Sequence, residues 1–146
     1  MNLSRMTKNI AAVLYGEIPP QAGEDDRDVI DQVTLVKKAL LSLDYKPAAL
    51  SLSLDLKQAA GRLKKIKPRF VFNLVESIRG RGEFIYFAPV LLDSLGIPYT
   101  GATTQAVMFT SNKVTAKQLF RIYDIPTPPW CRANQALAGD PGFAPP

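Results

Sequence analysis

The segment FVFNLVESIRGRGE at residues 70–83, with the residues that follow it, decides the fold of this 146-residue chain. Arg69–Leu74 is short and apolar, which predicts a buried strand. The glycine-containing stretch Val75–Glu83 is typical of a loop. Phe84–Leu95 then has the length of a helix, and Gly96 with a proline two residues beyond is the usual end of one. The segment therefore predicts one strand–loop–helix unit.

The rest of the chain repeats this alternation in both directions. Strands that alternate with helices are typical of parallel sheets covered on both faces. The sequence therefore predicts an α/β fold, a three-layer Rossmann-like domain with a mostly parallel sheet of about four strands. The other expected elements are a strand at Ile10–Tyr15, a loop at Gly16–Asp25, a helix whose apolar positions run from Val29 to Leu41, a strand at Ala48–Leu54, a helix at Leu56–Lys65, a short strand at Tyr99–Gly101, a helical turn at Thr104–Phe109 and a helix at Asn112–Tyr123.

Composition excludes several kinds of active site. The chain has no histidine, so a Ser-His-Asp nucleophile and a histidine-based metal site are both excluded. Its single cysteine, Cys131, rules out an internal disulfide and suits a reducing cytoplasm. The apolar run near the N-terminus is too short for a signal peptide or a membrane span. We expect a cytoplasmic protein that does not bind membranes.

The net charge of +5 has a simple explanation in clusters of basic residues at element ends. No aromatic residues are interleaved with these clusters as a base-stacking platform, and no nucleic-acid-binding motif is present. We therefore expect no nucleic-acid partner.

Neither G-x-G-x-x-G after the first strand nor G-x-x-x-x-G-K-[ST] occurs, which argues against a dinucleotide or Walker-type site. In a doubly wound sheet, ligands bind at the carboxyl ends of the strands. The loops after the first and third strands are therefore candidate ligand-binding loops.

Three segments together resemble a known family. They are VFNLVESIRGRGE at 71–83, LGIPYTG at 95–101 and IPTPPW at 125–130, with Asn112–Lys113 between the last two. This combination resembles the N-terminal, pre-ATP-grasp domain of D-alanine–D-alanine ligase and related ATP-grasp ligases, over roughly Asn9–Arg132. The resemblance implies a substrate domain at residues 1–130 and a linker or tail at 131–146. The ATP-grasp module of such enzymes is expected to be absent from this chain.

The resemblance also implies a reaction. Such ligases use ATP and two magnesium ions to phosphorylate one carboxylate, and an amine then attacks the acyl phosphate to form the amide of a peptidoglycan precursor. We expect an amino-acid substrate and a need for the missing ATP-grasp module. The 146 residues alone are expected to be inactive and to bind neither ATP nor Mg²⁺ tightly. Relatives of this kind are often dimers through this domain, so a homodimer is possible.

Asp26 and Asp28 lie at a predicted helix N-terminus. Helix capping, worth about 0.5–2 kcal/mol, is one explanation of acids at this position. The resemblance offers another, since the segment DRDV at 26–29 is similar to the family's E-R-E-V-S motif. The resemblance then implies that Asp26 corresponds to the glutamate that binds the substrate ammonium, and that Asp28 lies beside it.

The loop after the third strand contains Glu76, Ser77, Arg79 and Arg81. It corresponds to the family's substrate loop, although V-E-S replaces a pair that includes a histidine. The two arginines can receive a carboxylate through paired hydrogen bonds, and a solvated turn explains them equally well. The missing histidine leaves open a different amino-acid or peptide substrate.

Lys113 is similar to the family's lysine that reaches the ATP phosphates. Phosphoryl transfer needs fixed positive charge near the transferring group, which gives such a lysine a direct purpose. A surface lysine on a first helical turn is the alternative. A non-catalytic Rossmann-like binding domain also remains open as a function of the whole chain.

Overall fold

The computed structural model describes residues 9–18 and 24–130, with side chains in the second range from residue 28 onward. The chain divides into two compact units, one up to Met108 and one from Phe109, and each is described by itself. The linker or tail expected at 131–146 lies outside the described residues. The domain boundary expected at residue 130 therefore stays a prediction.

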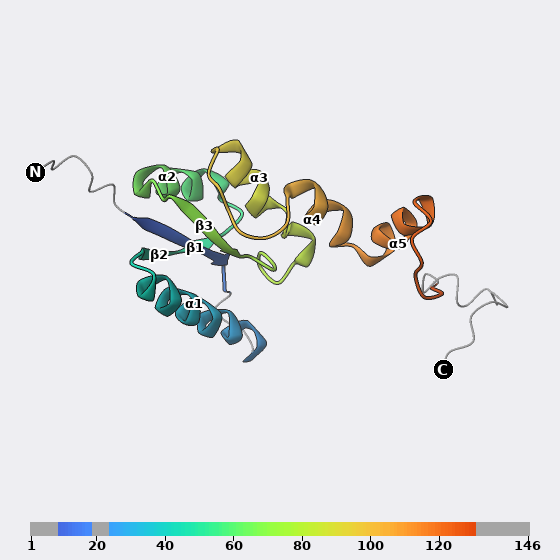
Figure 1. Cartoon of the computed structure of the whole chain (residues 1–146), viewed down its shortest axis with the longest axis horizontal. Coiled ribbons are helices and arrows are strands. Elements are labelled where there is room, and N and C mark those ends of the chain that lie inside the picture. Colours follow the sequence, from blue (N-terminus) through green and yellow to red (C-terminus); the bar gives the residue numbers. More distant parts are fainter. Residues whose placement is uncertain (1–8, 19–23, 131–146) are drawn as a thin grey trace, which may run out of the picture. The chain divides into compact units, whose positions relative to one another are not determined.

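A three-stranded parallel sheet forms the centre of the first unit (Figure 1). Its strands are β1 (Ile10–Gly16), β2 (Lys46–Leu52) and β3 (Phe70–Leu74), in the order β2-β1-β3. In the register, Ile10 lies beside Lys46 and Ala11 beside Phe70. All three strands therefore end at the same edge of the sheet, as the alternation of strands and helices predicts.

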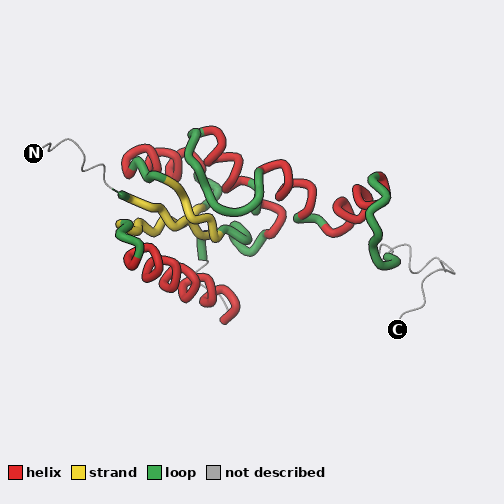
Figure 2. The backbone as a smooth tube through the Cα atoms, in the orientation of Figure 1, coloured by secondary structure: helices red, strands yellow, loops and turns green. Residues whose placement is uncertain are grey.

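Helices cover both faces of this sheet (Figures 1 and 2). Helix α1 (Glu24–Ser42) lies on one face, and α2 (Leu56–Ile66) and α3 (Phe87–Ser94) lie on the other. Strand β1 supplies side chains to both layers, because successive residues of a strand point to opposite faces. This arrangement confirms the predicted three-layer Rossmann-like fold.

The two hydrophobic cores divide the residues of β1 between them. Ala11 and Val13 pack in the core beneath α1, while Ala12 and Leu14 pack in the core beneath α2 and α3; all four are fully buried. A strand that is buried on both faces has no polar positions to alternate with its apolar ones. This is why Ile10–Tyr15 reads as one continuous apolar run.

The fourth strand expected at Tyr99–Gly101 is reduced to a single parallel bridge between Tyr99 and Val71. Val71 donates its N–H to the Pro98 carbonyl (2.8 Å), and Thr100 donates to the Val71 carbonyl (3.0 Å). Pairing goes no further, because Pro98 has no N–H to donate and Gly101 turns the chain at a φ of 104°. The described sheet therefore has three strands plus this bridge.

The helix expected at Phe84–Leu95 begins later than its periodicity predicts. A 3₁₀ turn, η2 (Gly82–Phe84), comes first, and α3 follows from Phe87. Pro89 lies in the first turn of α3, where its missing N–H costs no intrahelical hydrogen bond. The proline therefore fixes the beginning of this helix near Phe87.

The last two helices agree with the predicted ones within about a residue. They are α4 (Thr104–Thr110) and α5 (Lys113–Ile122). The Asn112 side chain caps α5 by accepting the N–H groups of Val114 (3.0 Å) and Thr115 (3.1 Å). Lys117 Nζ then donates to Thr127 Oγ1 (2.8 Å) and to the Pro128 carbonyl (3.3 Å). These two bonds hold the proline-rich connector against α5.

Gly16 is required where β1 meets the loop after β3. A Cβ atom at this position would lie 2.1 Å from the carbonyl oxygen of Ser77, which is backbone and cannot rotate away. We expect Gly16→Ala to lower the free energy of unfolding by about 1–3 kcal/mol, as overpacking does elsewhere. Urea denaturation measures this loss.

Gly61 provides the matched control. It lies inside α2, and a Cβ atom there would have nothing within 4 Å. We expect Gly61→Ala to raise the free energy of unfolding by about 0.5–1 kcal/mol, because alanine favours the helix. Equal effects of the two substitutions would contradict the close approach at Gly16.

Candidate functional site

A cavity of about 220 Å³ opens at the carboxyl ends of β1 and β3. This is the edge of a parallel sheet where ligands gather. Two of the described lining residues are carboxylates, one is a hydroxyl and three are apolar. The described lining residues are Gly16, Glu17, Ile18, Val29, Leu74, Glu76 and Ser77.

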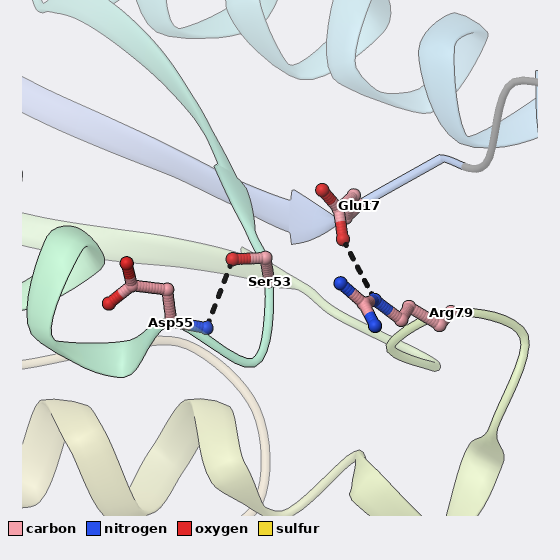
Figure 3. Close-up of polar contacts among 4 residues, drawn as sticks. All are labelled: Glu17, Ser53, Asp55 and Arg79. Carbon is pink, nitrogen blue, oxygen red and sulfur yellow. Dashed lines mark hydrogen bonds and ion pairs between the residues drawn. The ribbon is translucent and has the colours of Figure 1, made fainter.

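Glu17 lines this cavity, and both its backbone and its side chain make contacts with neighbouring elements. Its N–H donates to the Leu52 carbonyl (2.8 Å), which extends the pairing of β1 with β2 by one residue. Its carboxylate Oε2 lies 3.5 Å from Nε of Arg79 (Figure 3). Both side chains are substantially exposed, so the ion pair contributes at most about 1 kcal/mol. The pair therefore adds little to the stability of the fold, although it brings Arg79 to the edge of the cavity.

The end of β2 lies beside this pair but has a structural purpose (Figure 3). The Asp55 N–H donates to Ser53 Oγ (3.1 Å), and Asp55 Oδ1 accepts the N–H of Gln58 (2.9 Å). The Asp55 carboxylate is therefore the N-cap of α2. Glu17 and Glu76 are the described carboxylates that line the cavity.

Glu76 and Ser77, which the sequence singled out, both line the cavity. Arg79 lies in the same loop with a φ of 55° and reaches Glu17. Arg81 makes a different set of contacts. Its guanidinium binds Glu83 Oε1 through Nε (2.8 Å) and Nη2 (2.6 Å) and lies 4.2 Å from the ring centre of Phe84. The predicted role of either arginine in receiving a carboxylate stays a prediction.

Asp26 and Asp28 lie in the early part of α1, as expected. Asp28 is exposed, and the next residue, Val29, lines the cavity. The first turns of α1 therefore run beside the acidic cavity. The side chain of Asp26 lies outside the described residues, so its contact with a substrate ammonium stays a prediction.

Lys113 is the first residue of α5 and is exposed. It belongs to the second unit. Its ammonium is accessible to a phosphate, and its position after the Asn112 cap fixes the backbone from which the side chain extends. Its role toward a nucleotide stays a prediction.

Sequence reasoning did not name Glu17. A signal was available, because a carboxylate directly after the first strand of a parallel sheet lies at the ligand-binding edge. The apolar side of the cavity, formed by Ile18, Val29 and Leu74, was also missed. These three residues come from two strand ends and a helix, and no local pattern connects them.

The described residues contain neither a cluster of metal ligands nor a membrane-spanning helix. Among the side chains that the structure describes, at residues 9–18 and 28–130, no group of three or more His, Cys, Asp or Glu is placed to hold a metal ion. No helix in the part of the chain that the structure describes is long and apolar enough to cross a membrane.

This chain is 39% identical to a D-alanine–D-alanine ligase of Wolbachia pipientis over 93 residues, which are 64% of its length. The chain is similar to D-alanine–D-alanine ligases. A second such ligase, from Moorella thermoacetica, is 31% identical over 93 residues. An uncharacterized protein of Sinorhizobium fredii is 41% identical over 58 residues, which are 40% of this chain and 17% of that protein.

These matches have a limited extent. The matched region spans 28% of the length of the Wolbachia and Moorella ligases, so the chain corresponds to about a quarter of those proteins. No family model matches the chain. The similarity supports the resemblance to the N-terminal domain of such ligases that the three sequence segments indicate.

The contact between Arg81 and Glu83 predicts a pH dependence of stability. The hydrogen bond from Arg81 lowers the pKa of the Glu83 carboxyl from its ordinary value of 4.5. A carboxyl whose pKa is lower in the folded chain stabilises the fold above its unfolded pKa and loses that contribution as pH falls. We expect Glu83→Gln to be less stable than the native chain at pH 7, with the difference vanishing as pH falls below 4.5.

Urea denaturation of both proteins between pH 7 and pH 3 measures this difference. Arg81→Gln is the partner control, because it removes the group that lowers the pKa. In the Arg81→Gln background, Glu83→Gln should no longer produce the same pH-dependent difference. A difference that persists unchanged in this background would contradict the assigned cause.

Proposed function

We propose that this chain is the substrate-binding domain of a D-alanine–D-alanine ligase-like enzyme, an ATP-dependent ligase that joins a carboxylate to an amine. The observation that carries the proposal is the acidic cavity at the carboxyl ends of β1 and β3. It lies in a chain similar to D-alanine–D-alanine ligases over 93 residues. An amino acid is the substrate class that such a cavity suits best.

The chemistry of the cavity fits the amino group of such a substrate. Glu17 and Glu76 are both carboxylates. Arg79 lies 3.5 Å from the Glu17 carboxylate, whereas Glu76 forms no ion pair among the described residues, so Glu76 is the main acidic group offered to a ligand. An opposite charge within a few ångströms favours an ammonium over a neutral amine. Ser77 adds a hydroxyl that can accept or donate a hydrogen bond. Asp26, from α1, would supply a further acidic group toward the same ammonium.

Lys113 would contribute to the nucleotide site. ATP, when bound, supplies the phosphoryl group that activates the substrate carboxylate. An exposed ammonium at the beginning of α5 fits a phosphate as a point charge. In the ligases that the chain resembles, carboxylates of the ATP-grasp module hold the magnesium ions, and we propose the same arrangement here. On this proposal, we expect these 146 residues alone neither to hydrolyse ATP nor to join amino acids.

A related ligase with a different amino-acid substrate is the second candidate. The observation that favours it is the apolar side of the cavity, formed by Ile18, Val29 and Leu74. Such a surface gains free energy from burying a side chain larger than methyl, at about 0.8 kcal/mol per methylene. Comparing valine with alanine separates the two candidates, because the second expects valine to bind more tightly.

Ligand binding to the full 146-residue chain tests the proposed substrate class. We expect D-alanine to shift the amide resonances of Gly16, Glu76 and Ser77 in NMR titrations. D-lactate, which has a hydroxyl in place of the ammonium, should bind much more weakly. Glu76→Gln should weaken D-alanine binding by about fivefold, the equivalent of about 1 kcal/mol from one exposed charge. Asp26→Asn should act in the same direction.

Glu83→Gln is the matched control. It removes one carboxylate from the same loop, but Glu83 binds Arg81 and is not among the described lining residues. Its affinity for D-alanine should equal that of the native chain. Equal binding of D-alanine and D-lactate, or shifts that avoid the cavity, would refute an ammonium site. L-alanine, titrated in parallel, reports the stereochemical preference.

A further inference from the structure

A second cavity, of about 450 Å³, lies at the other end of β3. Pro68, which precedes β3, is one of its lining residues, whereas the acidic cavity is lined by residues at and after the end of β3. Its volume falls in the range of roughly 300–1,000 Å³ that is typical of small-molecule sites. Its described lining residues are Leu63, Lys64, Lys67, Pro68, Ser94, Leu95 and Ile97.

The cavity combines an apolar surface with two ammonium groups. Leu63 is fully buried, and Leu95 and Ile97 are partly buried against the core beneath α2 and α3. Lys64 and Lys67 are both exposed. Neither lysine forms an ion pair with an acidic side chain among the described residues. Their charges are therefore available to an anion.

The last turn of α2 is a favourable place for a basic residue, because the helix dipole is negative there, and Lys64 lies in that turn. At the end of α2, the Leu63 carbonyl accepts the backbone N–H of Lys67 (2.9 Å). At the end of α3, the Leu92 carbonyl accepts the N–H groups of Leu95 (3.2 Å) and Ile97 (3.1 Å). Backbone groups thus satisfy these terminal carbonyls. The lysine side chains are therefore not needed at the Leu63 and Leu92 carbonyls, and their ammonium groups can reach a ligand.

Lys67 also occupies an unusual backbone conformation. It caps α2 in the left-handed region, with φ 51° and ψ 59°, where glycine is ordinarily preferred. Asp44, Arg79 and Asp124 also have a positive φ, so the conformation itself marks a turn rather than a binding group. The cationic group of Lys67 is the feature that glycine would not provide.

We propose that this cavity binds a small amphipathic anion, a ligand with one carboxylate or phosphate head group on an aliphatic body. Lys64 and Lys67 bind the head group, and Leu63, Leu95 and Ile97 bury the aliphatic part. The site is separate from the acidic cavity, so it requires no part of the proposed ligase function. A ligand there would act as an effector or an accessory group rather than as the amino-acid substrate.

Titration of the full chain with sodium octanoate tests this proposal. We expect octanoate to shift the methyl resonances of Leu63, Leu95 and Ile97, and octyl phosphate to do the same. Whichever head group binds more tightly identifies the natural one. Octylammonium and acetate should fail to shift them, because the first has the wrong charge and the second has no aliphatic body. Each methylene added between hexanoate and octanoate should tighten binding by up to about fourfold.

The chain offers a closely matched set of variants. Lys64→Gln and Lys67→Gly should each weaken octanoate binding by about fivefold. Lys67→Gly also places glycine where the backbone favours it, so the variant should remain folded and at least as stable as the native chain. Lys65→Gln removes the same charge from the last turn of α2, at a residue that is not among the described lining residues, and should leave the affinity unchanged.

Three results would overturn the proposal. The first is equal weakening by Lys65→Gln and Lys64→Gln, which would show only a general effect of charge. The second is binding of octylammonium as tightly as octanoate, which would show an apolar site without charge selection. The third is an absence of shifts at the three apolar residues. None of these results bears on D-alanine binding at the acidic cavity, so the two proposals fail separately.

Discussion

The burial of β1 on both faces and its pairing along both edges is the constraint on which the first unit depends. Ala11 and Ala12 have no exposed surface, and they face opposite layers of helices. A strand in this position cannot slip by one residue without exchanging the side chains of the two cores. The register therefore fixes Gly16 as the residue of β1 that reaches the carboxyl edge of the sheet. It also fixes where the loops after β1 and β3 meet.

This constraint explains why most of the fold can be predicted from the sequence. Continuous apolar runs and helical periodicity are local signals, and they locate β1, α2 and α5 within a residue or two. The contacts that close the site are not local. Glu17 and Arg79 are 62 positions apart, and Gly16 meets the backbone of Ser77 only because β1 and β3 are neighbours. No pattern within a short window contains that information.

Arg79 and Arg81, the two arginines of the R-G-R-G sequence, also make contacts that a short window of sequence does not predict. They have the same chemistry and lie two residues apart, so sequence reasoning treats them alike. Their backbones separate them: Arg79 has a φ of 55°, whereas Arg81 is extended with a φ of −103°. Arg79 consequently reaches Glu17 across the sheet edge, and Arg81 turns to its neighbour Glu83. The cavity is left with acidic rather than basic described side chains.

The unequal distribution of charge has a physical consequence for ligand binding. The net charge of +5 suggests a chain that attracts anions, yet the described side chains at the carboxyl ends of β1 and β3 include two carboxylates. Pro68 of the second cavity and Leu74 of the acidic cavity lie at opposite ends of β3, whose five residues span about 16 Å. That distance is roughly twice the Debye length of about 8 Å at physiological ionic strength. Lys64 and Lys67 are therefore largely screened from a cation bound near Glu76. Each cavity selects its ligand by its own local charge, and any coupling between them would have to pass through the packing of α2 and α3 on the sheet.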